Sequence, residues 1–233
     1  MSTTGDSEAT TTTAATETST TNRKQPFPQG FLDTISTGWA ERPETFPPAR
    51  SRAAFAARRR HALSAAFPGE RLVFPAGELK QRSNDTDYRF RAHSAFAHLT
   101  GWGSDAEPGA ILVMDPLPDG GHEAVLYFRE RADRTTAEFY ADASIGEFWI
   151  GPRPALAGVA ADLGIRTDHI AAFAPADGER VVDVDADLTR AVSEMRLIKD
   201  EDEIAQMREA VAVTAAGFDD IVADLPRIAR HPR

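Results

Sequence analysis

The sequence predicts an α/β or α+β domain in which helices flank a mixed β-sheet. Short apolar strands alternate with amphipathic helices, and one pair of strands is separated only by a turn-rich stretch. A short turn joins antiparallel neighbours, whereas a helical crossover can join parallel strands. Because this chain carries both kinds of connection, we expect one sheet with both strand directions.

The first predicted element is a helix that follows Ser51 and is closed by Pro68 and Gly69. Its apolar residues recur at helical spacing and its other face is basic, so we expect that basic face to be solvated. The apolar positions are Phe55, Ala62, Leu63, Ala66 and Phe67, and the basic ones are Arg52, Arg58, Arg59 and Arg60.

Three apolar runs predict the centre of the sheet. Residues 72–74 form a short buried strand, and residues 109–114 and 123–128 form a β-hairpin around a turn-rich stretch at 115–121. Further elements follow the hairpin in order. They are helices at 135–140 and 154–163, strands near 169–173 and 180–182, and a helix at 185–194. Pro154 is expected in the first turn of its helix and Gly164 at the end.

The last predicted element is a long amphipathic helix. Asp200 and Glu203 have the spacing of a capping box, and the acidic first turn suits the positive end of the helix dipole. The helix carries an apolar stripe: Ile204, Met207, Val211, Thr214 and Phe218. Such a stripe needs a partner, so we expect this helix to open a second domain that is truncated in the 233-residue chain.

Composition excludes several classes of function. The chain has no cysteine, which excludes disulfides and thiolate chemistry and favours a cytoplasmic location. Its net charge of −10 argues against general affinity for nucleic acid or anionic lipid. No apolar run is long enough to span a membrane. We therefore expect neither a nucleic-acid nor a membrane partner.

The first fifty residues divide into two parts. Residues 1–22 are rich in Thr, Ser and Ala, carry no targeting signal and are expected to be a disordered tail. Residues 23–50 contain aromatic residues and prolines, so they predict either an arm laid over a surface or a simple linker. The aromatic residues are Phe27, Phe31, Trp39 and Phe46.

The residues themselves offer no catalytic or metal-ligating constellation. The histidines include no pair at the spacing of a helical metal site, and there is no nucleophile-elbow, phosphate-loop or dinucleotide motif. Asp183, Asp185, Asp187 and Glu194 have the spacing of a calcium loop, but Leu188 replaces the glycine of the sharp turn. We expect a charged corner between strand and helix there.

Three segments in order carry a family resemblance. Residues 88–102 resemble the "Y-x-F/Y-R-x-x-S-x-F-x-x-L/F-T-G" stretch of the amino-terminal domain of Xaa-Pro aminopeptidases (aminopeptidase P). Residues 146–153 resemble its "W-x-G-x-R" stretch, and residues 194–210 look like its interdomain crossing. The resemblance implies a creatinase-type amino-terminal domain at 51–196, after the tail at 1–22 and the arm at 23–50. Residues 197–233 would be the crossing segment and the first helix of a catalytic domain.

The resemblance also implies an activity. Family enzymes release the amino-terminal residue from Xaa-Pro peptides with two divalent metal ions, usually manganese, held in a downstream "pita-bread" domain. No metal-ligand motif follows the crossing helix, and Asp219, Asp220 and Asp224 read as a solvated helical face. We therefore expect no catalytic residue and no bound metal in this chain, and no peptide hydrolysis by it alone.

The resemblance assigns substrate contact to Trp149 and Arg153. The family's tryptophan and arginine lie near the mouth of the active site, where an indole suits a proline ring. The alternative is that Trp149 is a core residue and Arg153 pairs with an acidic neighbour. Residues 88–102 are expected to be structural or to lie in an oligomer interface, since family members commonly assemble through this domain.

Two functions therefore remain open. The first is the amino-terminal, non-catalytic part of an Xaa-Pro aminopeptidase, which shapes the substrate entrance and makes homo-oligomer contacts. The alternative is a stand-alone interaction module of the same fold that binds a partner through its last helix. Outside these two, a related enzyme of other specificity, such as a prolidase, is the remaining alternative.

Overall fold

The computed structural model describes residues 27–42, 46–84, 86–118 and 120–230. The predicted tail at 1–22 lies outside these ranges. Contacts divide the chain into two compact units, a larger one of residues 40–131 and 152–233 and a smaller one of residues 1–39 and 132–151. No helix in the described ranges has both the length and the apolar character that a membrane crossing requires.

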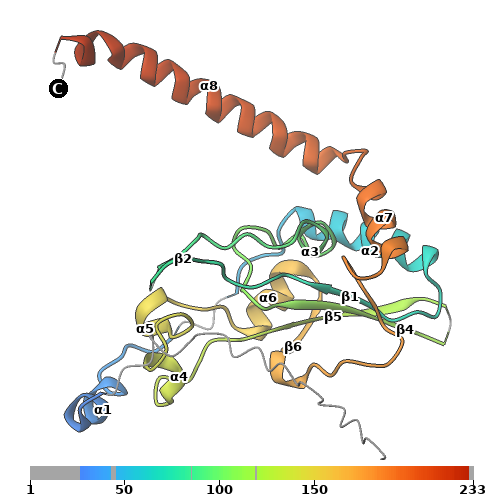
Figure 1. Cartoon of the computed structure of the whole chain (residues 1–233), viewed down its shortest axis with the longest axis horizontal. Helices are drawn as coiled ribbons and strands as arrows, with labels where there is room; N and C mark the ends of the chain where they lie inside the picture. The colour runs from blue at the N-terminus through green and yellow to red at the C-terminus, as the bar shows by residue number, and fades with distance from the viewer. Residues whose placement is uncertain (1–26, 43–45, 85, 119, 231–233) are drawn as a thin grey trace, which may run out of the picture. The chain divides into compact units, whose positions relative to one another are not determined.

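A five-stranded mixed sheet forms the centre of the larger unit, in the order β6-β5-β4-β1-β7 (Figure 1). β4 pairs antiparallel with β5 and with β1, while the outer strands β6 and β7 run parallel to their neighbours. The bounds are β1 Leu72–Pro75, β4 Ile111–Pro116, β5 His122–Phe128, β6 Arg166–His169 and β7 Arg180–Val181, with β2 Gln81–Ser83 and β3 Thr86–Asp87 in a separate pair. The predicted mixed sheet and its central hairpin are confirmed.

Both faces of the three central strands are buried. Every second residue of each strand joins the main hydrophobic core, as the two-residue period of a strand requires. These core residues are Leu72 and Phe74, Leu112 and Met114, and Leu126 and Phe128. Val73, Val113 and Val125 alternate with these core residues, are aligned across the sheet and are also buried. This explains why the three runs are almost continuously apolar.

Helices supply the other half of the core. Leu63, Leu99, Leu163 and Leu188 each come from a different helix and are all but inaccessible to solvent. Figure 1 shows α2, α3 and α7 over one face of the sheet. The helices of this unit are α2 Arg52–Ala66, α3 Ser94–Thr100, α6 Leu156–Leu163, the 3₁₀ helix η2 Ile170–Ala172, α7 Ala186–Met195 and α8 Glu201–Ala229.

Three local predictions are wrong. The strand expected near 169–173 is β6, which ends at His169, where the His169 side chain accepts a hydrogen bond from the Ala171 amide and the chain turns into η2. Pro154 lies in an extended segment before the first turn of α6. Its carbonyl accepts a hydrogen bond from Arg131 N at 3.0 Å. Arg60, assigned to the solvated face of α2, is buried. Its guanidinium donates to Leu99 O at 2.7 Å, and burial lowers its pKa to about 10.

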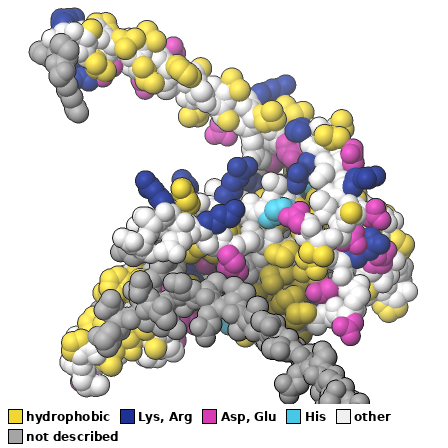
Figure 2. All heavy atoms as spheres, viewed as in Figure 1, with side chains coloured by type: hydrophobic (Ala, Val, Ile, Leu, Met, Phe, Trp, Pro, Cys, Tyr) yellow, Lys and Arg dark blue, Asp and Glu magenta, His cyan; other side chains and the backbone are white. Residues whose placement is uncertain are grey.

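The last helix begins as the sequence predicts. The Asp200 carboxylate accepts from Glu203 N at 3.0 Å, and the Glu203 carboxylate accepts from Asp200 N at 3.1 Å, so the capping box is complete. After the first turn no residue of α8 is buried. Hydrophobic side chains lie along it in Figure 2, among them Met207, Val211, Phe218, Ile221 and Leu225.

Candidate functional site

A tight helical turn in the smaller unit presents Trp149. This unit contains α1 Gln29–Ile35, α4 Ala137–Tyr140 and α5 Glu147–Ile150. Gly146 is the residue just before α5, and a β-carbon there would lie 2.7 Å from Asp142 O and 2.8 Å from Phe139 O. Since both atoms belong to the backbone, only glycine fits, and this close approach fixes where α5 starts.

The indole of Trp149 is exposed but held in place. The residue is 49% exposed, and its Nε1–H donates to Tyr140 O at 2.7 Å. Phe148 packs against it edge to face, with ring centroids 5.1 Å apart. Because the only donor of the indole is already used, the ring offers a neighbour apolar and π contact without a hydrogen bond.

Other side chains support this turn from within the smaller unit. Glu147 is buried, and its carboxylate accepts a hydrogen bond from Ala132 N at 2.9 Å. This bond links α5 to the first residue of the 132–151 segment of the smaller unit. Aromatic rings in mutual contact surround the turn. They are Phe27, Phe31, Trp39, Phe139, Tyr140 and Phe148, so three of them come from the region predicted to be an arm or a linker.

Arg153 lies in the larger unit and is buried. It is only 5% exposed, and its guanidinium donates to Arg129 O at 2.7 Å and Glu130 O at 2.5 Å. Its Nε lies 3.6 Å from the Glu107 carboxylate. These contacts fasten the chain before α6 to the end of β5, which is a structural role. Contact of Arg153 or Trp149 with substrate stays a prediction, and the two residues belong to different units.

A hollow of about 390 Å³ lies next to Arg153 within the larger unit. Phe46, Trp102 and Val159 contribute apolar walls. Arg50 stands on its rim with Asp105 and Asp162. The Arg50 guanidinium donates to Asp162 Oδ1 at 2.9 Å and to Asp105 Oδ2 at 3.0 Å, and the Asp162 bond raises the Arg50 pKa. With Arg131, Arg153 and Glu107 included, three arginines and three carboxylates of the described residues line the hollow and compensate one another.

An ionic network anchors the start of α8 to α2 and α3. Asp200 pairs with Arg59, and Glu203 Oε1 lies 3.3 Å from His98 Nδ1. Burial lowers the pKa of His98, nearby Arg59 lowers it further, and Glu203 opposes the change. Burial acts to raise the pKa of Asp200, but the hydrogen bonds from Glu203 N and Arg59 outweigh it and hold that pKa below its usual range.

The acidic runs noted in the sequence do not assemble into a metal site. Asp185 caps α7 by accepting from Leu188 N at 2.8 Å, as expected of a corner between strand and helix. Asp224 pairs with Arg227 on the exposed face of α8. Throughout the described residues no group of three or more His, Cys, Asp or Glu side chains could hold a metal ion. The side chains of the described ranges therefore do not fit a catalytic metal pair.

Comparison with known proteins places the chain. The larger unit is an α/β domain with a mixed sheet covered by helices and followed by a capped, solvent-exposed helix. The family model "Aminopeptidase P, N-terminal domain" matches residues 55–176, and the chain belongs to this family.

Among curated relatives, Xaa-Pro aminopeptidase 2 of Streptomyces coelicolor is 42% identical over 220 residues, covering 83% of this chain and 45% of that protein. Xaa-Pro aminopeptidase 1 of the same organism is 41% identical over 219 residues, covering 84% and 44%. A solved histidine-to-alanine variant of Escherichia coli aminopeptidase P matches 72% of this chain and 44% of its own, with 25% identity and a TM-score of 0.52. The chain thus spans about half the length of these relatives.

Proposed function

We propose that this chain is the amino-terminal, non-catalytic part of an Xaa-Pro aminopeptidase, a metallo-exopeptidase that releases the first residue from Xaa-Pro peptides. The observation that carries the proposal is the identity of 41–42% to two Xaa-Pro aminopeptidases across more than four fifths of the chain. This chain covers only about half the length of those relatives. In this proposal the metal pair, its ligands and the hydrolytic step lie in the other half, outside the described residues.

Within this proposal Trp149 forms part of the wall of the substrate entrance. Its fixed and exposed indole, with the N–H already bonded to Tyr140 O, suits an apolar ring that neither needs a hydrogen bond from the indole nor offers one to it. A prolyl residue fits that description, because its nitrogen carries no hydrogen within a peptide. Arg153 supports the entrance indirectly, since its guanidinium is used to hold the carbonyls of Arg129 and Glu130.

The proposal extends to assembly and location. The family resemblance supports three further parts of the proposal. They are homo-oligomer contacts through this domain, a peptide substrate and a cytoplasmic location. The exposed apolar stripe on α8 supports a further contact, because extended apolar surface on a soluble protein marks sites of interaction.

A chimera tests the proposed function. In it this chain replaces the aligned region of Streptomyces coelicolor Xaa-Pro aminopeptidase 2, and cleavage of an Xaa-Pro peptide is followed with manganese present. We expect the chimera to cleave the peptide and the isolated chain to be inactive. Manganese-dependent cleavage by the isolated chain, or a folded chimera without activity, would contradict the proposal.

A matched pair of substitutions in the chimera tests the role of Trp149. Trp149→Ala should raise KM for the Xaa-Pro peptide, by about tenfold if the indole covers one ring. Trp149→Phe keeps an apolar ring and should lose less. Equal KM values for all three proteins would remove Trp149 from the substrate entrance.

The intact mass of the protein in its source cells separates the proposal from the stand-alone module. A mass near 25.3 kDa would favour a short interaction protein. A mass about twice as large would favour one chain that carries both domains.

A further inference from the structure

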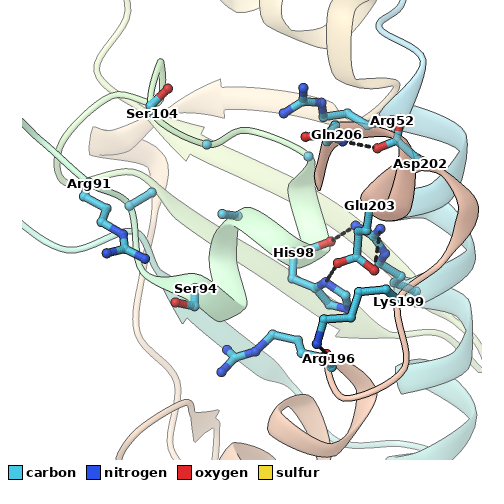
Figure 3. A pocket seen from close by; sticks show the side chains of 15 residues that line it. Arg52, Arg91, Ser94, His98, Ser104, Arg196, Lys199, Asp202, Glu203 and Gln206 are labelled. Carbon is cyan, nitrogen blue, oxygen red and sulfur yellow. Dashed lines mark hydrogen bonds and ion pairs between the residues drawn. The ribbon is translucent and has the colours of Figure 1, made fainter. Parts of the chain in front are cut away.

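A second hollow, in the larger unit, is lined by basic side chains that the proposed function does not use. It has a volume of about 410 Å³ and lies where α2, the segment leading into α3, and the turn between α7 and α8 meet. Arg52 comes from the first of these, Arg91 from the second, and Arg196 and Lys199 from the third. In Figure 3, Arg52 lies at one end of the hollow, and Arg91, Ser94 and Arg196 lie along the opposite side.

The two carboxylates at this hollow are already engaged. Glu203 bonds to Asp200 N, lies 3.3 Å from His98 Nδ1 and pairs with Arg59 at 3.5 Å. Asp202 accepts from the Ser51 hydroxyl at 3.4 Å and from the Gln206 amide. Neither forms an ion pair with Arg52, Arg91 or Arg196.

The basic groups remain uncompensated. Among the interactions of the described residues, the guanidinium groups of Arg52, Arg91 and Arg196 have no ion pair. Lys199 donates to the carbonyls of Arg196 and Leu197 at 2.6 and 3.2 Å, which holds its ammonium in place without neutralising it. The hollow is therefore locally positive within a chain of net charge −10. Like charges gathered in this way repel one another unless an anion joins them.

Several arginine side chains around one hollow favour the binding of oxyanions. A guanidinium binds carboxylate or phosphate oxygens through paired N–H donors, and the hydroxyls of Ser94 and Ser104, which also line the hollow, add further donors. The volume lies within the range of small-ligand sites. From these observations we infer that the hollow binds a small polyanion carrying two or more phosphate or carboxylate groups.

Binding of this kind has a structural consequence. Arg196 and Lys199 belong to the turn that leads into α8, whereas Arg91 belongs to the segment before α3. An anion held between them links the turn to the body of the larger unit, in addition to the Arg59–Asp200 and His98–Glu203 contacts. The inference does not depend on peptidase activity and can be tested on the chain itself.

Titration calorimetry with pyrophosphate and with citrate tests the site in the purified chain. We expect saturable binding with a dissociation constant of about 1 mM or tighter at moderate salt, weakening as salt rises. Binding of pyrophosphate alone identifies phosphate as the ligand chemistry, binding of citrate alone identifies carboxylate, and binding of both supports a general oxyanion site. No saturable binding of either up to roughly 10 mM would overturn the inference.

Substitutions localise the binding. Arg91→Gln and Arg196→Gln should each weaken it by about tenfold, as loss of a charge-assisted hydrogen bond predicts. The matched control is Arg58→Gln, since Arg58 is a largely exposed arginine of α2 that stacks over Phe55 and does not line the hollow. Equal weakening by the control would mean general charge attraction and would refute the site.

Thermal unfolding shows whether the variants keep the fold. Because Arg91 and Arg196 have no ion pair within the described part of the chain, their substitution should leave the unfolding midpoint nearly unchanged. If one of them fails to fold, Arg52→Gln supplies a further variant at the opposite end of the hollow.

Discussion

Arg153 and Trp149 show how differently two residues of one motif can be used. Arg153 is buried and bonded to two backbone carbonyls, whereas Trp149 is half exposed and keeps its ring available. Pro152 and Pro154 flank Arg153, so the backbone there is restricted to extended geometry. The guanidinium of Arg153 therefore stabilises the fold through its hydrogen bonds to the backbone.

Arg153→Ala should lower the free energy of unfolding by about 2–3 kcal/mol, because it leaves two carbonyls without their charged donor. Arg153→Lys keeps a charge but loses the planar fork, so an intermediate loss is expected. Urea unfolding of the three proteins measures the difference. Unchanged stability in Arg153→Ala would leave substrate contact as the better explanation for this residue.

The pH dependence of stability should carry a contribution from His98. Its pKa in the folded chain lies below the ordinary 6.5, chiefly because it is buried. As the pH falls below about 6.5 the unfolded chain takes up this proton more readily than the folded chain does, so the free energy of unfolding falls. Above that pH both forms are neutral and the contribution disappears.

His98→Asn should remove this slope. Urea unfolding at several pH values between about 5 and 7 measures it, since Asp200, with an ordinary value of 3.8, titrates well outside that window. The same slope in wild type and variant would show that His98 takes up its proton equally in both states.

The site residues could be predicted from the sequence only in part. The motif at residues 146–153 locates Trp149 and Arg153, but the burial of Arg153 depends on carbonyls at the end of β5 that no local pattern indicates. The hollow between α2, α3 and α8 was also missed, because its arginines are distant in sequence and look like ordinary surface charges. The predicted basic face at residues 52–60 supplies two of the residues that line the hollow, Arg52 and Arg59, but no pattern in the sequence indicates that they form a site.

Among the elements, the long ones were the predictable ones. α2, α6, α7 and α8 span two or more turns and lie close to their predicted bounds, and the β4–β5 hairpin carries its own turn. The predicted faces of α2 are only partly right, because Ala62 and Ala66 are exposed and Arg60 is buried. α4 lies within the helix predicted at 135–140, whereas α3 and α5 have seven and four residues, which is too short for an amphipathic period to be distinguished. Their positions come from tertiary contacts such as those of Gly146 and Glu147.

The start of α8 offers a test at this scale. Asp200→Ala removes the cap and the partner of Arg59, and should cost about 1 kcal/mol or somewhat more. Asp200→Asn keeps a capping side chain and loses only the charge, so it should cost less. Amide hydrogen exchange in the first turn of α8 measures both, and equal exchange in the two variants would mean that the charge alone matters.

For the whole molecule, the exposed stripe of α8 should govern behaviour in solution. Val211 and Phe218 are 69% and 63% exposed, and further apolar residues continue along the helix. We expect the purified chain to associate as its concentration rises, because water is excluded from such a stripe when two copies meet.

Val211→Glu combined with Phe218→Glu should shift the chain toward monomer in sedimentation velocity experiments. Circular dichroism controls for loss of the helix itself. A wild-type chain that stays monomeric at all concentrations would show that the stripe does not drive association.

The pairing of β1 with β7 has a consequence for how the chain folds. β4 and β5 are neighbours in sequence, whereas Leu72 of β1 must meet Arg180 of β7. Local contacts form early and distant ones carry a larger loop-closure cost. During synthesis the hairpin can therefore form first, while the sheet waits for β7 to leave the ribosome. Until then the edge of β1 stays open, and this is the stage at which the nascent chain is most exposed to mispairing.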